Sequence, residues 1–286
     1  MATKNKAGWA ALPSAAPRFD FSGDALKKAW KDLHAGDREP FPDDKRAAAL
    51  IKALGKSAPK GLDAGALADA LQDAWRGFHE GRFEAGFDGG KALGAAGASV
   101  ATKCLGVHAA YLVDDKAEAL SCFQSLVTLA DEAVTSLPGE ANSHYRRAFG
   151  LGRHSQGISV VKALKDGMAG KVRESLDRAL ALEPEHAEAR LALAMYHAEI
   201  VSKVGGMIAG LTYGAKGAEA EKQIAEAMRL FSKSPVTLLE KGNVALLLKG
   251  AKGEDEAAAC FEKAAKTKSR DAMEWLDARE AASRIE

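Results

Sequence analysis

Apolar residues recur every three or four positions along the C-terminal half of the chain, which is the spacing of an amphipathic helix. One such helix is predicted over 171–183, and Pro184 ends it. The same alternation of small and large apolar residues returns at 220–231 and 257–268. Each of these helices follows another amphipathic segment, at 142–155, 187–204 and 235–248. This half of the chain therefore predicts a run of helical hairpins.

The distance between equivalent positions indicates the kind of repeat. Ala179 and Ala227 are 48 residues apart, and Ala227 and Ala264 are 37 apart, whereas a tetratricopeptide unit has about 34 residues. The longer distance contains an insertion, which maps to the glycine-spaced apolar segment 204–217. A comparable excess at 156–170 widens the preceding hairpin. Because insertions in repeat proteins collect on one face, often the binding face, both are candidates for function.

A second self-match lies near the N-terminus. Residues 25–36 and 70–81 share Ala, Leu, Ala, Trp, His and Gly in the same register, which indicates a duplicated unit of helix and turn. Trp30 and Trp75 occupy equivalent positions in the two copies. We expect them to be core residues, and the alternative is a module that supports oligomer formation through these two rings.

The rest of the N-terminal part is less regular. A helix is predicted over 42–54, with Pro at its start and Gly after its end. The glycine-rich segment 86–98 either packs closely as a helix or breaks, and its interleaved Ala and Leu favour packing. We divide the chain into a flexible arm (1–21), divergent helical hairpins (22–138) and a tetratricopeptide-like region (139–286).

Composition supports an all-α protein and narrows its partners. Ala accounts for 59 of the 286 residues, and Ala is the best helix former and a poor strand former. The formal net charge of +1 gives no electrostatic signature of nucleic-acid binding. No stretch approaches the ~20 apolar residues of a membrane span, and the N-terminus has no secretory pattern. We therefore expect a cytoplasmic protein whose three cysteines, Cys104, Cys122 and Cys260, are free thiols.

Four stretches, 148–167, 178–189, 196–200 and 213–215, carry a resemblance to a known family. Over about residues 140–280 the chain resembles the tetratricopeptide-like domain of the regulator-of-microtubule-dynamics family and its bacterial relatives. More loosely, it is similar to the periplasmic helical-repeat component of tripartite ATP-independent transporters. The resemblance implies a superhelix of helix pairs and a binding role, with no activity or cofactor. Because the eukaryotic members are membrane-anchored and the transporter component is exported, features absent here, we expect only the fold to transfer.

Motifs for catalysis, cofactors or metals are not apparent. Residues 86–91 approach a phosphate-binding loop but lack its spacing and the hydroxyl after Lys, and 152–157 has one residue too many for a nucleophile elbow. No two histidines are four residues apart, as a helical zinc site would need. His34 and His79, near the ends of the duplicated helices, are expected to hydrogen-bond the last carbonyls of those helices. The sequence thus predicts neither an enzyme nor a bound cofactor or metal.

Amphipathic and charged side chains concentrate around the two insertions, and three of the four tyrosines are among them. The candidate ligand- or partner-binding residues are Tyr145, Arg146, His154, Tyr196, His197, Glu199 and Tyr213. On one interpretation these side chains pack the insertions against the helices and satisfy their polar ends locally. On the other, they line a concave groove or an apolar pocket.

The function that these features predict is a binding or scaffold protein, whose concave face recognises a peptide or protein partner. One alternative is a carrier of a small apolar ligand, with 204–217 as a lid over its pocket. A second is an enzyme whose site is scattered along the sequence. The sequence leaves the oligomeric state and the identity of the partner open.

Overall fold

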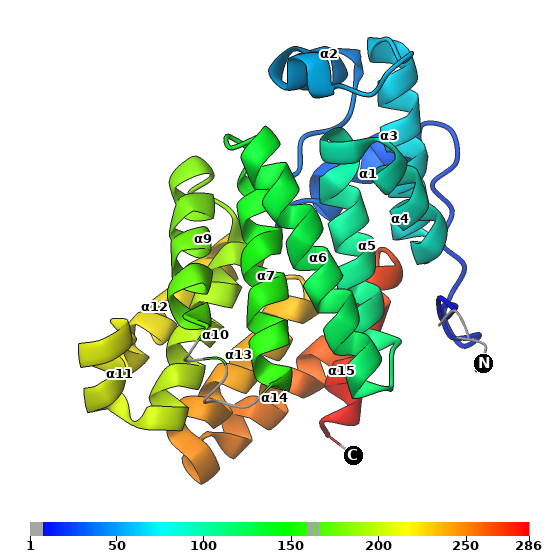
Figure 1. The fold of residues 1–286 in the computed structure, drawn as a ribbon. Coiled ribbons are helices and arrows are strands. Elements are labelled where there is room, and N and C mark those ends of the chain that lie inside the picture. The colour runs from blue at the N-terminus through cyan, green and yellow to red at the C-terminus, as the bar shows by residue number, and fades with distance from the viewer. Residues whose placement is uncertain (1–7, 159–162, 164–165, 286) are drawn as a thin grey trace, which may run out of the picture.

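The computed structural model describes residues 8–158, 163 and 166–285 of the chain. Over these residues the secondary structure is helical, with no β-strand (Figure 1). The all-α prediction is confirmed.

The helices follow one another with short connections. The N-terminal part contains α1 (Ala25–Leu33), α2 (Asp44–Leu54), α3 (Ala64–His79), α4 (Phe83–Ala92), α5 (Ala98–Tyr111) and α6 (Lys116–Ser136). The C-terminal part contains α7 (Ala141–Gly157), α9 (Met168–Leu182), α10 (Ala187–Val204), α11 (Gly206–Tyr213), α12 (Gly217–Phe231), α13 (Pro235–Lys249), α14 (Glu254–Ala265) and α15 (Ala272–Ser283).

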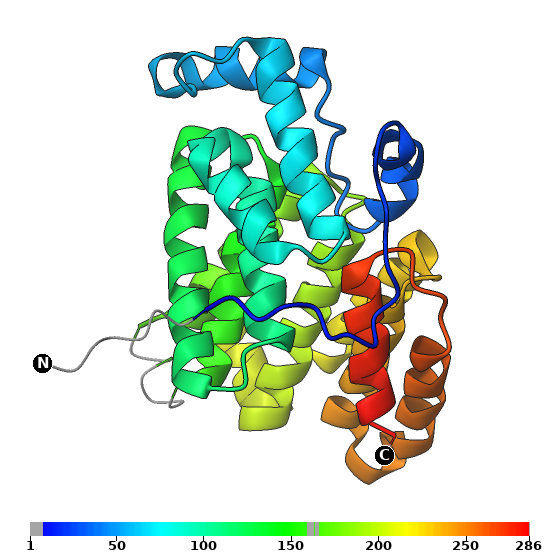
Figure 2. The ribbon, with the colours of Figure 1, turned by 90° about the vertical axis from the view of Figure 1, so that its right-hand side faces the viewer.

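These helices pack as consecutive pairs, α3 with α4, α5 with α6, α7 with α9, α10 with α12, and α13 with α14. The first helices of neighbouring pairs also contact one another and form the inner layer, while the second helices form the outer layer. The array curls until α15, which packs on α13 and α14, also contacts α3 and α5 (Figures 1 and 2). The inner layer is therefore closed by the last helix of the chain.

Local sequence explains where several helices begin and end. Asp43, Asp63 and Asp115 each accept a hydrogen bond, 2.8 Å long, from a backbone N–H in the first turn of the helix that follows. Gly55, at the end of α2, has φ of 52°, a conformation that glycine adopts without strain. The predicted boundaries of α10 agree with the structure, and α11 occupies the predicted insertion 204–217.

The glycine-rich segment 86–98 both packs closely and breaks. A Cβ on Gly97 would lie 2.1 Å from the carbonyl oxygen of Gly90, so α4 and the turn after it approach to backbone contact. The chain nevertheless leaves the helix at Leu93, and Gly94 has φ of 58°. We expected the segment to be one closely packed helix without a break. The close packing is present, but it occurs between α4 and a separate helical turn after it, so the expectation of an unbroken helix was wrong.

The described part of the N-terminal arm is held against the helices, in contrast to the predicted flexible arm. Residues 8–20 contain no helix and run across the surface of the helical array toward α1 (Figure 2). The ring of Trp9 packs on Phe87 and His108, with a centroid separation of 4.4 Å to the imidazole. The backbone N–H of Ala10 donates to His108 Nε2 at 2.9 Å. These contacts fix the path of the chain into α1; residues 1–7 lie outside the described part.

The duplicated tryptophans are core residues. Trp30 and Trp75 are 6% and 2% exposed, and their rings meet edge to face with centroids 5.6 Å apart. Buried rings cannot form a contact between copies of the chain, so the alternative of oligomer formation through them is wrong. Their core also includes Ala272 and Leu276 of α15. The two ends of the chain thus share one hydrophobic core.

Candidate functional site: a buried polar network on the inner face

The inner side of the curled array is occupied by the chain's own residues 34–39, the loop that follows α1. The backbone N–H of Glu188, in the first turn of α10, donates to the carbonyl of Gly36 at 3.0 Å. A Cβ on Gly36 would lie 2.6 Å from the ring of Phe231, so a glycine permits this approach. The Asn142 side chain donates to the carbonyl of Asp37 at 3.0 Å, and just before the loop the Arg270 guanidinium donates to the carbonyl of Asp32 in α1 at 2.7 Å. This inner loop, residues 34–39, is therefore bound from several sides.

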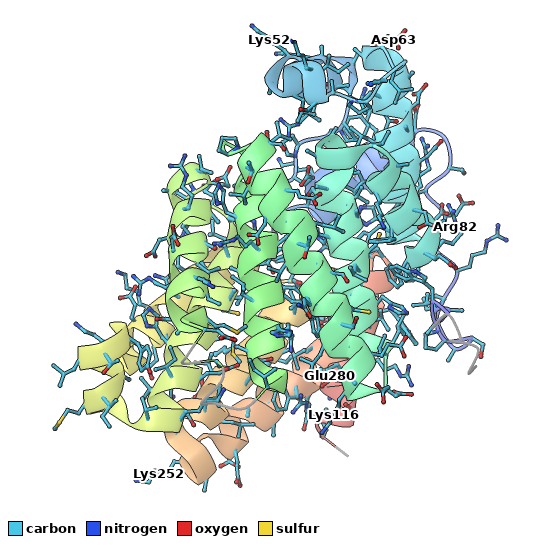
Figure 3. All side chains as sticks on the ribbon, in the orientation of Figure 1. Lys52, Asp63, Arg82, Lys116, Lys252 and Glu280 are labelled. Atoms are coloured by element: carbon cyan, nitrogen blue, oxygen red, sulfur yellow. The ribbon has the colours of Figure 1, made fainter. Side chains whose placement is uncertain are left out.

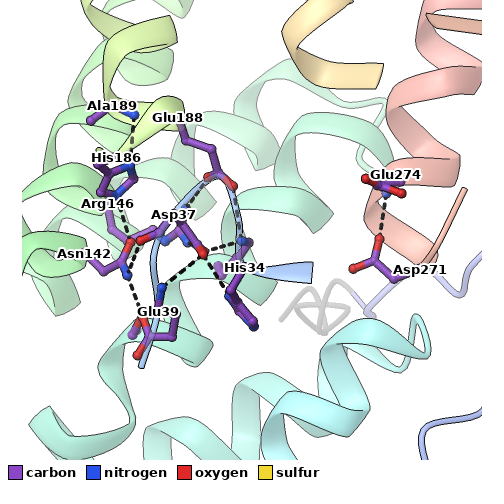
Figure 4. Close-up of polar contacts among 12 residues, drawn as sticks. His34, Asp37, Glu39, Asn142, Arg146, His186, Glu188, Ala189, Asp271 and Glu274 are labelled. Carbon is purple, nitrogen blue, oxygen red and sulfur yellow. Dashed lines mark hydrogen bonds and ion pairs between the residues drawn. The ribbon is translucent and has the colours of Figure 1, made fainter. Parts of the chain in front are cut away.

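Asp37 lies at the centre of the inner loop and is 1% exposed. Its Oδ2 accepts from Lys103 Nζ of α5 at 2.5 Å and from Arg146 Nη2 of α7 at 2.9 Å (Figure 4). Glu188 completes the group, with its two carboxylate oxygens 3.5 Å from Lys103 Nζ and 3.4 Å from an Arg146 nitrogen. Two anions and two cations from the inner loop, α5, α7 and α10 thus form one buried ionic group.

Neutral groups extend this network and position it. Asn142, in the first turn of α7, donates to the backbone carbonyl of Asp37 at 3.0 Å and to Glu39 Oε2 at 2.7 Å. Its own carbonyl oxygen faces Nε2 of His186 at 3.1 Å, while Nδ1 of His186 accepts from the N–H of Ala189 and caps α10 (Figure 4). These roles require the His186 tautomer with hydrogen on Nε2.

The electrostatics follow from burial and pairing. Burial alone would raise the pKa of Asp37, but Lys103, His34 and Arg146 outweigh it and hold this pKa well below its usual value. Burial would lower the pKa of Lys103, and the carboxylates of Asp37 and Glu188 raise it instead. For His186 burial dominates and lowers the pKa to about 3. Asp37 and Lys103 are therefore charged at neutral pH, and His186 is neutral.

The pKa of Glu39, at the end of the inner loop, is shifted in the opposite direction to that of Asp37. Burial and the nearby charge of Asp37 raise its pKa to about 7. The Ser99 hydroxyl donates to its Oε2 at 2.5 Å. The cavity beside it has a volume of about 20 Å³, which is room for about one water molecule.

A chain of four side chains connects the inner loop to α3 and α15. His34 Nδ1 lies 2.8 Å from Asp37 Oδ1, the two Nε2 atoms of His34 and His79 are 3.1 Å apart, and His79 Nδ1 lies 2.7 Å from Asp271 Oδ2. The expectation that these histidines bond helix carbonyls was therefore wrong. The duplicated units place both side chains in the interior, where their partners are carboxylates and each other.

The structure separates the seven predicted site residues into two groups. Arg146 belongs to the buried ionic group, and Tyr145 packs beside it, with its ring centroid 4.7 Å from that of His186. The others are on α7, on the second half of α10 and at the end of α11: His154, Tyr196, His197, Glu199 and Tyr213.

The second group holds α11 in place. The Tyr196 hydroxyl donates to the carbonyl of Tyr213 at 3.0 Å, and the N–H of Lys216 donates to His197 Nδ1 at 3.3 Å. Glu199 accepts from Lys203 at 3.2 Å and is also hydrogen-bonded to Gln156 of α7. The Tyr196 hydroxyl and Nδ1 of His197 are thus used locally, whereas the buried Nε2 of His197 has no hydrogen-bond partner among the described residues.

Helix α11 presents apolar side chains to solvent. Met207, Ile208 and Leu211 are 81%, 53% and 84% exposed, whereas Ala209 on the same helix is fully buried. Figure 1 shows α11 projecting at the far end of the array from α3 and α4, and Figure 3 shows its side chains extending outward. Exposed side chains do not enclose a pocket, so the arrangement does not favour α11 as a lid over an apolar ligand.

Sequence reasoning missed most of the network, namely Asp37, Glu39, Lys103, Glu188 and Asp271. One signal was available: Lys103 is the single Lys, Arg, Asp or Glu of α5, which reads ASVATKCLGVHAAY and is buried over most of its length. A lone charge on a buried helix requires a partner, but its partner lies 66 residues away.

Comparisons with known proteins show the fold alone. Neither the protein-family models nor the curated proteins contain a match. Among solved structures, the chain is similar to the crystal structure of TTC0263, a thermophilic TPR protein in Thermus thermophilus. The TM-score is 0.52 at 15% sequence identity, over 76% of this chain and 100% of that one. The chain therefore has a tetratricopeptide-like helical-repeat fold.

Two further findings concern sites and membranes. Within 8–158, 163 and 166–285, His, Cys, Asp and Glu side chains form no group of three or more that could hold a metal ion. Over the same ranges, each helix is too short or too polar to cross a membrane. Cys104 and Cys260 are buried and Cys122 is partly buried, all three as free thiols.

Proposed function

We propose that this protein is a non-enzymatic scaffold that binds a protein partner through the α11 surface, defined as Met207, Ile208 and Leu211. The concave face was the expected binding surface. With residues 34–39 filling the inner side, the charged groups of that face are already paired with one another. The outer α11 surface is the stronger candidate for the partner.

The observation that carries this proposal is the exposure of three large apolar side chains on one eight-residue helix. Contiguous apolar surface on a folded protein marks an interaction site more often than chance exposure does. The helices before and after α11 have charges of both signs, Glu199 with Lys203 on α10 and Glu219 with Lys222 on α12. An apolar centre with a mixed polar rim is the anatomy of a protein interface, whereas an anionic membrane would favour a basic rim.

Tyr196, His197 and Tyr213 have a supporting role in this proposal, because they hold α11 and the residues after it to α10. Glu199 bonds to Lys203 of α10 and to Gln156 of α7, so it joins α10 to α7. The resemblance to the regulator-of-microtubule-dynamics family supports a helical-repeat domain with a binding role, and it implies no activity.

The test places a photo-crosslinking amino acid at position 211 of the full chain in an extract of the native host. A discrete set of protein adducts is expected, and the double variant Met207→Ser/Ile208→Ser should reduce them at least tenfold. The control variant is Ile285→Ser, another exposed apolar residue at the far end of the chain (44% exposed). Adducts with lipid alone, or protein adducts unaffected by the double variant, would contradict the proposal.

A further inference from the structure

The two histidines that join the inner loop to α3 face each other through the same ring nitrogen. Their Nε2 atoms are 3.1 Å apart, and each Nδ1 is within 2.8 Å of a carboxylate oxygen, from Asp37 on one side and Asp271 on the other. His34 and His79 are 3% and 0% exposed. Water therefore does not supply the missing partners.

The contacts among Asp37, His34, His79 and Asp271 require one hydrogen more than two neutral imidazoles carry. An ionised carboxylate can only accept, so each Nδ1 must carry a hydrogen. A neutral imidazole has one N–H, which leaves both Nε2 atoms as bare lone pairs pointing at each other. Two lone pairs at hydrogen-bond distance repel, whereas an N–H···N bond has about this length. We propose that His34 and His79 share one additional proton, and that this shared proton holds the inner loop to α3 and α15.

The carboxylates do not supply that proton. The pKa of Asp37 is held well below its usual value, as described above. For Asp271, burial alone would raise the pKa, but the hydrogen bond and charge of His79 and the backbone N–H of Glu274 lower it. Both acids are therefore ionised at neutral pH and act as acceptors.

The surroundings fit a proton better than a metal ion. The donors that face the gap are two nitrogens, and the walls are aromatic: the Trp30 ring centroid lies 4.0 Å from that of His34, and the Trp75 ring stacks on His79 at 5.8 Å. Four-coordinate zinc in proteins takes three or four protein ligands. The described residues offer no third His, Cys, Asp or Glu here.

The charges around the pair decide where the proton resides. The charged groups that act directly on the pair are Asp37, Lys103 of α5 and Asp271. Arg146 of α7 contacts Asp37, Glu188 contacts Lys103, and Glu274 of α15 contacts Asp271. Asp37 and Glu188 are balanced by Lys103 and Arg146, and Glu274 is paired with Arg270. Only Asp271 of this set then lacks a cation, so the imidazolium resides on His79.

Two consequences follow for pH. Above the ordinary histidine pKa of about 6.5, the folded protein binds one proton more than the unfolded chain, so stability decreases as pH rises until the pair loses its proton. In acid, a second proton would place two imidazolium rings against each other. Burial already lowers the pKa of His34 to about 4. The link between the inner loop and α3 is therefore intact within a window of pH and weakens on both sides.

The test uses the full-length protein labelled with ¹⁵N-histidine. At pH 7, two-bond ¹H–¹⁵N spectra should show His34 with hydrogen on Nδ1 alone and His79 with hydrogens on both nitrogens, or their fast average. Two neutral rings with one N–H each would overturn the proposal. Stoichiometric zinc or copper in the protein purified without added metal would overturn it as well.

A stability measurement gives the second readout. Between pH 7 and the value at which the pair deprotonates, the folding equilibrium constant should fall by up to tenfold per pH unit, and His79→Gln should remove this dependence. The matched control is His144→Gln, a buried histidine whose Nε2 bonds the carbonyl of Pro138 at 3.0 Å and faces no second imidazole. An equal pH slope in the wild type and His79→Gln would refute the shared proton; if His79→Gln does not fold, the spectra of the wild type decide.

Discussion

Replacing Asp37 by Asn tests whether the buried ionic group holds the inner loop to α5, α7 and α10. The substitution keeps the shape of the side chain and removes its charge. The Asp37 carboxylate accepts from Lys103, Arg146 and His34. In the variant, Lys103 and Arg146 would retain only the longer contacts to Glu188, at 3.5 and 3.4 Å.

The expected loss of stability is large because the remaining charges stay buried. Removing one partner of a buried pair typically costs about 3–5 kcal/mol, since it leaves an uncompensated charge in the interior. Lys103 is 3% and Arg146 4% exposed, so neither can reach solvent without opening the inner layer. We therefore expect Asp37→Asn to lower the free energy of unfolding by about 3–5 kcal/mol at pH 7.

The assay is urea unfolding followed by circular dichroism, with Asp177→Asn as the matched control. Asp177 also pairs with an arginine, Arg173, at 2.8 Å, but these side chains are 52% and 35% exposed. An exposed pair contributes about 0.2–1 kcal/mol, so the control should remain close to the wild type. If Asp37→Asn costs no more than Asp177→Asn, the reasoning about a buried ionic group is wrong.

A double-mutant cycle separates the loss of the pair from the burial of an orphan charge. Lys103→Met alone leaves Asp37 with Arg146 and His34, and combined with Asp37→Asn it removes one charge of each sign. The double variant should be more stable than the sum of the two single losses predicts, by about 0.5–3 kcal/mol. Additive losses would mean that these two side chains do not interact in the folded protein.

Three further predictions concern packing, pH and the outer surface. Gly97→Ala should strongly destabilise the protein in urea unfolding, because its Cβ would lie 2.1 Å from a carbonyl oxygen of α4, whereas Gly152→Ala, in open space on α7, should stabilise it by up to about 1 kcal/mol; similar effects of the two would contradict the described packing. The pKa of His186 is about 3 in the folded protein and about 6.5 when unfolded, so stability should fall as pH is lowered from 6.5 toward 3, by up to about 1.4 kcal/mol per unit. His186→Asn, which keeps an N-cap acceptor, should reduce this acid dependence, and an unchanged slope would refute the assignment. Met207→Ser and Leu211→Ser should each change the unfolding free energy by less than about 0.5 kcal/mol, because both side chains are exposed, and a larger loss would mean that these two side chains are buried in the folded protein.

The sequence predicted the helices well because each helix is specified by neighbouring residues. The apolar spacing and Pro184 located α9 and α10, and Gly55 marked the end of α2. The 48-residue spacing located the insertion that contains α11. Helical periodicity, capping residues and helix-breaking residues act over a few positions, so they can be recognised in a single sequence.

The candidate site was only partly predictable, and the reason is distance along the chain. Arg146 was among the predicted residues, but its partner Asp37 is 109 residues away, and the His79–Asp271 contact joins residues 192 apart. The alternatives for Tyr196, a groove residue or a packing residue, also depend on what lies opposite its hydroxyl. Periodicity indicates which residues face the interior, but it does not indicate which residues they contact there.

The sequence by itself determined a chain of helical hairpins with two apolar insertions, because small residues at repeating positions allow helices to pair closely. The insertion at 204–217 contains α11, and part of the insertion at 156–170 lies outside the described residues. Only the tertiary structure decided that the array closes, with α15 against α3 and α5, and that residues 34–39 fill its inner side. Closure is set by the accumulated rotation of successive pairs and by buried charges that must find partners across the ring. The accumulated rotation and the pairing of the buried charges depend on the whole assembly of helices. They therefore cannot be predicted from any one segment of the sequence.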